Sequence, residues 1–237
     1  MEDSERGLPS IVGFDLHHVL ARPSFLGMFL CLFTFTTWTE KFWLLLYALN
    51  PAVWFYCLLS LWERAIPERI VQKLIVRFPG FHDLRLANLI QEISNSQLPH
   101  LDTWNLVYQL KQEGHILCIT SNITTNFLSD LRQKWIEMSP HWRTEPNYCH
   151  LPADLFSLFD FCFTTDAIDD YQRKPSVKYF ERWLAQIQRT HDGAAIFFVD
   201  DSKRNIRTAN ATGKISGIQY KSAKQLYWNL HDNELIP

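Results

Sequence analysis

Polar side chains that can do chemistry stand where apolar stretches of this sequence end. Three stretches typical of buried strands each end in a carboxylate or a hydroxyl, and a lysine precedes a proline at an expected helix start. These residues are Asp15, Ser121 with Asn122, Lys174, and the pair Asp200 and Asp201. A nucleophile, a hydrogen-bond donor, a cation and an acid pair form a set suited to phosphoryl transfer.

Asp15 is the expected nucleophile, because a carboxylate can attack phosphorus and divide one difficult step into two. A lysine could neutralise Asp15 and the transferring phosphoryl group, and Lys174 and Lys178 lie one helical turn apart near the expected helix start. Ser121 would donate a hydrogen bond to a phosphoryl oxygen, helped by Asn122 and nearby backbone N–H groups. The structural alternatives are an aspartate that caps a turn and an ordinary turn at Ser121.

Asp200 and Asp201 are adjacent acids, which repel each other unless a cation or solvent separates them. Mg²⁺ accepts few carboxylates and leaves room for phosphate oxygens and water. The pair therefore suggests a magnesium site, with a helix cap beside Ser202 as the competing interpretation.

Strand-like and helix-like segments alternate in most of the chain. Strands are expected at 11–15, 115–120, 158–164, 194–199 and 215–220. Helices are expected at 102–111, at 124–137, from Pro175 through Leu184, and from Ser202 to near Gly213, with a polar loop over 139–153. Such alternation predicts a parallel sheet covered by helices on both faces, with ligands at the carboxyl ends of its strands.

The ordered set of site residues resembles the haloacid dehalogenase (HAD) superfamily, over nearly the whole chain outside 22–98. The resemblance implies an α/β fold, a three-layer, Rossmann-like core made of 1–21 and 99–237. It also implies that 22–98, which reads as helical, is an inserted cap domain.

The same resemblance implies a role for each matching residue. By analogy to the family's lysine-proline signature, Lys174 is the lysine that neutralises Asp15 and the phosphoryl group, and Lys178 is expected in solvent. Mg²⁺ would be held by Asp15 and by the backbone carbonyl of His17. A further ligand would come directly from Asp201, or Asp200 would support the site. Asn205 matches a position where the family often holds an Asn or Asp, and it is expected behind the site.

His17 departs from the pattern, because phosphatases of the family carry a second Asp there. An imidazole can still move protons near neutral pH, since its ordinary pKa is about 6.5. His17 is therefore expected to act as general acid and base in a variant nucleophile motif, with decayed catalysis as the rival hypothesis. His18 stands where the family usually has glycine.

Three functions remain in competition. A Mg²⁺-dependent phosphatase that acts on a small phosphorylated substrate accounts for the whole set. A 2-haloacid dehalogenase would use Asp15, Ser121 and Lys174 but has no use for a metal, so the acid pair counts against it. A catalytically impaired binding protein explains His17 but not the remaining intact site.

The stretch 25–62 is strongly apolar, and no charged residue lies between Phe42 and Trp62. A single membrane crossing would separate Asp15 from Asp200, and the first of two candidate crossings, Phe25 to Trp38, is too short to cross a bilayer. A hairpin that packs on the core or forms a homodimer is the first expectation. A shallow membrane hairpin with tryptophans at the headgroups is the second.

Composition sets the remaining limits. Hydrophobic residues make up 47% of the 237 residues, so a large core is expected. The net charge of −2 and the absence of a basic run argue against nucleic acid as a partner. The 5 Cys lack CxxC spacing, and the amino terminus has no secretory pattern, so a cytoplasmic protein is expected, with membrane association left open through 25–62.

Overall fold

The computed structural model describes residues 9–22, 96–165 and 173–237. The chain divides into two compact units, Met1–Arg22 with Leu98–Pro237, and Pro23–Gln97. The predicted cap at 22–98 and its apolar stretch 25–62 therefore lie outside the described residues, apart from the two ends of the cap. No helix within the described ranges is long and apolar enough to cross a membrane.

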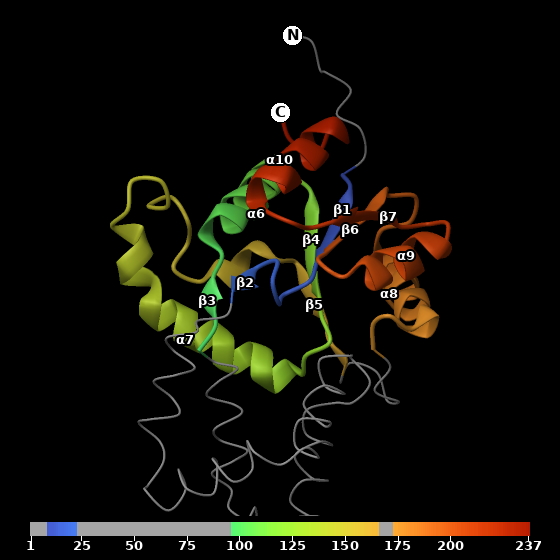
Figure 1. The fold of residues 1–237 in the computed structure, drawn as a ribbon, viewed down its shortest axis with the longest axis horizontal. Coiled ribbons are helices and arrows are strands. Elements are labelled where there is room, and N and C mark those ends of the chain that lie inside the picture. Colours follow the sequence, from blue (N-terminus) through green and yellow to red (C-terminus); the bar gives the residue numbers. More distant parts are fainter. Residues whose placement is uncertain (1–8, 23–95, 166–172) are drawn as a thin grey trace, which may run out of the picture. The chain divides into compact units, whose positions relative to one another are not determined.

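Five parallel strands form the sheet of the first unit, in the order β5-β4-β1-β6-β7 (Figure 1). Their bounds are β1 Ile11–Phe14, β4 Ile116–Thr120, β5 Phe161–Phe163, β6 Ile196–Asp200 and β7 Ser216–Gln219. The most central strand, β1, pairs with β4 on one side and with β6 on the other. The predicted parallel α/β fold is confirmed, although β5 is shorter than the predicted 158–164, because Leu155–Leu158 forms the 3-10 helix η2 before it.

Alternate residues of the central strands point to opposite faces of the sheet, as the strand period requires. Val12 and Phe14 of β1 belong to one buried cluster, and Ile11 belongs to another. The first cluster holds apolar residues of α6 (Leu101–Gln112), α7 (Thr125–Arg143) and α10 (Ala223–Asp232); the second holds those of α8 (Val177–Thr190) and α9 (Lys203–Ala211). The core therefore has three layers, with the sheet in the middle (Figure 1).

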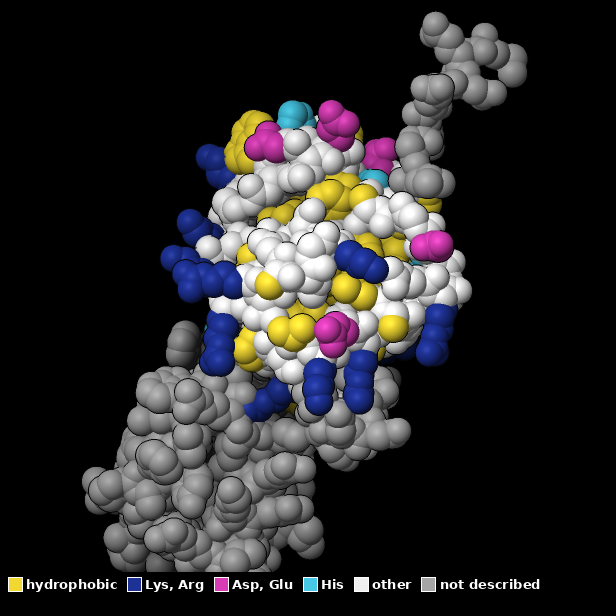
Figure 2. Space-filling model, turned by 90° about the vertical axis from the view of Figure 1, so that its right-hand side faces the viewer, with side chains coloured by type: hydrophobic (Ala, Val, Ile, Leu, Met, Phe, Trp, Pro, Cys, Tyr) yellow, Lys and Arg dark blue, Asp and Glu magenta, His cyan; other side chains and the backbone are white. Residues whose placement is uncertain are grey.

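The outer side of α8 and α9 is solvated and mainly cationic (Figure 2). Its exposed charged side chains are Lys178, Glu181, Arg182, Arg189, Lys203, Arg204 and Arg207. The opposite sides of both helices carry the buried residues of the second cluster, so each helix is amphipathic.

Two helix boundaries differ from the sequence expectation, and one helix was not expected. The helix α7 continues through Pro140 to Arg143, where a loop was predicted, and this extension buries Trp142. The helix α8 begins at Val177 with Ser176 as its N-cap, so Pro175 precedes the helix instead of opening it. The helix α10 was not predicted at all, although Ser222 caps its start by accepting a hydrogen bond from the backbone N–H of Gln225.

The root of the insertion is a short antiparallel ladder between β2 (Ala21–Arg22) and β3 (Leu98–Pro99), which was also not predicted. Here the outgoing and returning chain segments lie side by side. The indole N–H of Trp104 and the backbone N–H of His100 both donate to the carbonyl oxygen of Leu20, at 2.9 and 2.8 Å. These bonds tie the loop after Asp15 to the start of α6.

Candidate active site

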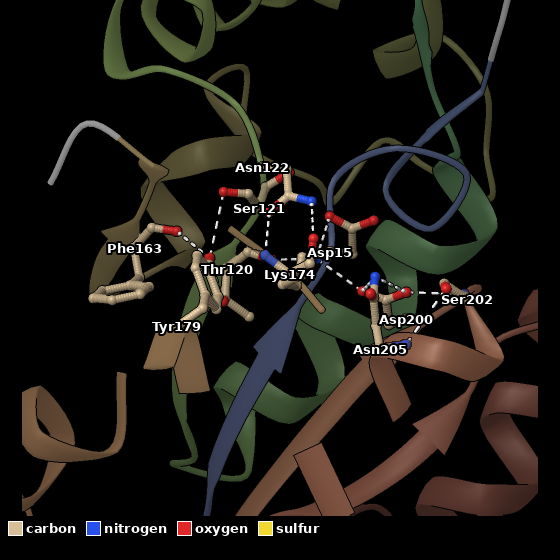
Figure 3. Close-up of polar contacts among 10 residues, drawn as sticks. All are labelled: Asp15, Thr120, Ser121, Asn122, Phe163, Lys174, Tyr179, Asp200, Ser202 and Asn205. Atoms are coloured by element: carbon tan, nitrogen blue, oxygen red, sulfur yellow. Dashed lines mark hydrogen bonds and ion pairs between the residues drawn. The ribbon is translucent and has the colours of Figure 1, made fainter. Parts of the chain in front are cut away.

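The carboxyl edge of the sheet brings together the predicted site residues from distant parts of the chain (Figure 3). Asp15 follows β1, Ser121 follows β4, and Asp200 is the last residue of β6. The backbone N–H of Asp15 donates to the carbonyl of Val199 at 2.9 Å, which continues the β1–β6 pairing to the nucleophile position. The sheet itself therefore fixes where the Asp15 side chain starts.

Lys174 is the cation at the centre of this edge, and its side chain is 1% exposed. Its ammonium nitrogen lies 2.8 Å from Asp15 Oδ1 and 2.8 Å from Asp200 Oδ2, and it donates to the carbonyl of Thr120 at 3.0 Å. Burial alone would lower the pKa of Lys174, but Asp15 and Asp200 outweigh it, and the net direction is upward.

Three contacts use all three N–H donors of the Lys174 ammonium. A direct hydrogen bond from Lys174 to a substrate oxygen therefore requires one of these contacts to open. Its predicted substrate-binding role stays a prediction, while its neutralisation of the two carboxylates is directly visible in the geometry.

Asn122 uses its amide on the main chain of Lys174. Its Oδ1 accepts the backbone N–H of Lys174 at 2.7 Å, and its Nδ2 donates to the carbonyl oxygen of Lys174 at 3.0 Å. Only one amide hydrogen is left over, so the structure gives Asn122 a contact that differs from its predicted substrate-binding role.

Ser121 presents a hydroxyl that is buried and lacks a hydrogen-bond partner among the described residues, although the residue is only 1% exposed. A buried, unpaired hydroxyl is costly and calls for a partner that the described residues do not supply. Such a donor at the edge that holds Asp15 suits the oxygen of a bound anion.

Asp200 is completely buried and accepts hydrogen bonds on both oxygens. Its Oδ1 accepts from the backbone N–H of Ser202 at 2.8 Å, and Asn205 Nδ2 lies 3.0 Å from both oxygens. Burial raises the pKa of Asp200 to about 7, Lys174 opposes the rise, and Asp15 adds to it. The predicted place of Asn205 behind the site agrees with these contacts.

Asp201 is exposed and completes a cluster with Asp15 and Asp200, in which one oxygen of each lies within 4.8 Å of the others. Burial is the main cause that raises the pKa of Asp201, and the negative charge of Asp15 adds to it. When all three carboxylates are ionised, they and the Lys174 ammonium carry a net charge of −2, which a dication would neutralise. Oxygen donors in this arrangement fit Mg²⁺.

His17 and His18 occupy the loop that follows Asp15. His17 is half-buried and forms an isolated β-bridge with Ala21. Its ring centroid lies 5.9 Å from that of Phe127. Its predicted roles as proton carrier and carbonyl ligand stay predictions. His18 is exposed and has φ of 61°, the left-handed conformation that favours glycine.

Comparisons with solved structures find the same architecture in enzymes. A predicted HAD-like family hydrolase from Porphyromonas gingivalis is 17% identical with a TM-score of 0.58, covering 96% of this chain and 98% of its own. A HAD family enzyme from Bacteroides thetaiotaomicron, solved with magnesium and inorganic phosphate, is 17% identical with a TM-score of 0.52, covering 90% and 94%. The L-2-haloacid dehalogenase from Xanthobacter autotrophicus with chloropropionic acid covalently bound is 15% identical with a TM-score of 0.54, covering 97% and 85%.

The chain has the HAD fold. No protein-family model and no curated protein matches the sequence. The fold alone does not decide between the chemistries of these neighbours, since one was solved with magnesium and phosphate and another with chloropropionic acid covalently bound.

Within the HAD fold of this chain, one residue at the site was missed from the sequence. Tyr179 of α8 is fully buried, and its hydroxyl lies 2.9 Å from Thr120 Oγ1, 3.1 Å from the carbonyl of Phe163 and 3.3 Å from that of Ser121. Burial raises the pKa of this phenol, so it stays protonated and can donate. Helical periodicity marks Tyr179 as a core residue, and nothing in the sequence distinguishes it from other buried aromatics.

Proposed function

We propose that this protein is a Mg²⁺-dependent hydrolase of phosphoric monoesters that works through an aspartyl-phosphate on Asp15. The observation that carries the proposal is the cluster of Asp15, Asp200 and Asp201 around one point, next to the buried Lys174. The unpaired hydroxyl of Ser121 gives independent support, because it offers a donor for an anionic oxygen.

In the first step, Asp15 attacks phosphorus with a carboxylate oxygen, and the ester P–O bond breaks as the new O–P bond forms. The Lys174 ammonium lies 2.8 Å from Oδ1 of Asp15, so the attacking carboxylate is paired with a positive charge. His17 gives its proton to the departing oxygen, and Ser121 donates a hydrogen bond to the phosphoryl group.

In the second step, His17 takes a proton from water, the water oxygen bonds to phosphorus, and the bond between Asp15 and phosphorus breaks. Inorganic phosphate leaves, and both side chains return to their starting states. Mg²⁺ held by Asp15, Asp200, Asp201 and the carbonyl of His17 would supply positive charge opposite the phosphoryl oxygens.

The experiment is a steady-state assay on a generic phosphate monoester with and without Mg²⁺. We expect slow, Mg²⁺-dependent release of phosphate by the wild type, no release by Asp15→Asn, and equal or faster release by His17→Asp. An inactive wild type with an active His17→Asp would indicate a decayed enzyme whose present role is binding. Inertness of every variant, including His17→Asp, on a broad phosphate panel would end the enzyme assignment.

The second candidate function is a 2-haloacid dehalogenase, because a neighbour of that activity shares the fold and Asp15 and Lys174 suit it. It gives no use to the carboxylate cluster of Asp200 and Asp201. Mg²⁺-independent release of halide from a 2-haloacid would establish it in place of the phosphatase.

The insertion is proposed to supply substrate selectivity and a partner surface through 25–62, either to a second copy of the chain or to a membrane. Sedimentation with lipid vesicles tests the membrane alternative. We expect the purified protein to remain in the supernatant without detergent. Salt-insensitive pelleting that disappears when 25–62 is deleted would instead establish a membrane hairpin.

A further inference from the structure

In two segments of the site, a side chain of each hydrogen-bonds to the main chain of the other (Figure 3). From the end of β4, Asn122 reaches the segment before α8 and holds both polar backbone atoms of Lys174, at 2.7 and 3.0 Å. An amide that accepts from the N–H and donates to the C=O of one residue fixes the orientation of the two peptide units that flank this residue, as a neighbouring strand would.

Tyr179 makes the return contact from α8 to the end of β4. Its phenol has one proton and three oxygen neighbours, so the Thr120 hydroxyl can donate to the phenol oxygen while the phenol donates to a carbonyl. The carbonyls within reach belong to Ser121, at 3.3 Å, and to Phe163 of β5, at 3.1 Å. Tyr179 thereby supports the main chain that carries the Ser121 hydroxyl.

The two supported residues carry the charged and polar groups of the proposed phosphoryl site. Lys174 has a flexible four-carbon stem, yet its ammonium meets two carboxylates and a carbonyl at 2.8 to 3.0 Å. Such precision needs a fixed backbone at the base of the side chain, and the Asn122 amide supplies it from a segment more than 50 residues away in sequence.

We propose that Asn122 and Tyr179 form a crossed brace, in which Asn122 positions Lys174, Tyr179 positions Ser121, and neither residue touches the substrate. The brace fixes the position of the Lys174 ammonium relative to the Ser121 hydroxyl through contacts between the end of β4 and the start of α8. Its kinetic consequences rest on the proposed function, whereas its structural consequences do not.

The first test is amide hydrogen exchange of the full chain, measured residue by residue by NMR. In Asn122→Ala the backbone N–H of Lys174 loses its acceptor. We expect the exchange rate of this amide to rise on the order of 10-fold or more beyond any change in the other amides. Asn122→Asp retains an acceptor oxygen, so the same amide should stay slow. The matched control is Asn210→Ala. Asn210 Oδ1 accepts the backbone N–H of Gly217 at 2.7 Å, and this hydrogen bond lies outside the site.

Tyr179→Phe tests the return contact by removing one hydroxyl. We expect faster exchange of the Ser121 amide, which donates to the Phe163 carbonyl that Tyr179 supports. Tyr148→Phe is the matched control, since it removes a phenol hydroxyl that donates to Asp102 at the surface. In Tyr148→Phe, only amides near Asp102 should exchange at a changed rate.

The second test is kinetic. Asn122→Ala should lower kcat by about 10- to 100-fold through misplacement of Lys174, while inhibition by inorganic phosphate stays near the wild-type level. Loss of phosphate inhibition with an unchanged kcat would instead show that Asn122 binds the substrate, and the brace would be rejected.

The outcomes separate the brace from the proposed function. If no phosphate ester is hydrolysed, the exchange data still decide: a fast Lys174 amide in Asn122→Ala and a slow one in Asn122→Asp support the brace. An unchanged Lys174 amide in Asn122→Ala overturns it. If Asn122→Ala fails to fold, a fast Lys174 amide in Asn122→Asp or an unchanged Ser121 amide in Tyr179→Phe overturns it.

Discussion

Replacement of Lys174 by methionine removes the only charge that balances two buried carboxylates within the described site. At an effective dielectric constant of about 20, each 2.8 Å contact contributes roughly 6 kcal/mol of attraction before desolvation. The desolvation of the ions cancels much of this sum, and loss of one partner of a buried pair typically costs about 3–5 kcal/mol. We expect Lys174→Met to destabilise the metal-free protein by about that amount at pH 8.

The assay is urea unfolding in the presence of a chelator, followed by circular dichroism and tryptophan fluorescence. A second substitution gives the sharper result. In the wild type Asp15 is paired with Lys174, but in Lys174→Met it only repels Asp200. Asp15→Asn should therefore recover about 1 kcal/mol or more in the Lys174→Met background.

Either of two results would contradict this role of Lys174. One is an unchanged urea midpoint and slope in Lys174→Met. The other is further destabilisation when Asp15→Asn is added to Lys174→Met. The Asp15→Asn single variant is the control, since it shows the effect of the amide while the ammonium is still present.

Three further predictions use thermal or urea unfolding. His18→Gly should stabilise the protein by about 0.5–1 kcal/mol, because φ of 61° costs a side chain more than it costs glycine; equal stability would show that no strain exists. Gly13→Ala should cost about 1–3 kcal/mol, since its Cβ would lie 2.4 Å from the Trp183 ring, and an unchanged midpoint would contradict this packing. Burial raises the pKa of Asp200 to about 7, so this group stabilises the metal-free protein at acid pH and loses that contribution as pH rises through about 7. Mg²⁺ competes with these protons and should raise Tm more at about pH 8 than at about pH 5.5, an effect that Asp201→Asn should reduce; a larger gain at acid pH would contradict the assignment.

The fold and most of the site could be predicted because their signals are local. Apolar runs that end in Asp15, Ser121 or Asp200 mark strands, and the carboxyl ends of parallel strands meet at one edge. Length and composition of each run were sufficient for this inference, and the resemblance to the HAD superfamily placed Lys174 beside them.

The features that were missed depend on contacts distant in sequence. Whether a helix stops before a proline depends on what the next turn can bury, and Trp142 decides this for α7. The role of Asn122 depends on the backbone of Lys174, which is 52 residues away in the sequence, and no local sequence pattern predicts such a hydrogen bond. The helix α10 did have a local signal, in Ser222 followed by Leu226 and Leu230 at helical spacing.

The most direct test of the central claim is to trap the phosphorylated enzyme. His17→Ala is mixed with a phosphate monoester and Mg²⁺, quenched in acid and analysed by intact mass and peptide mapping. Because water activation needs the base, we expect an adduct of one phosphoryl group on Asp15 that accumulates in His17→Ala and is absent from Asp15→Asn. Turnover by the wild type without any adduct in His17→Ala, or with the adduct on another residue, would contradict this mechanism.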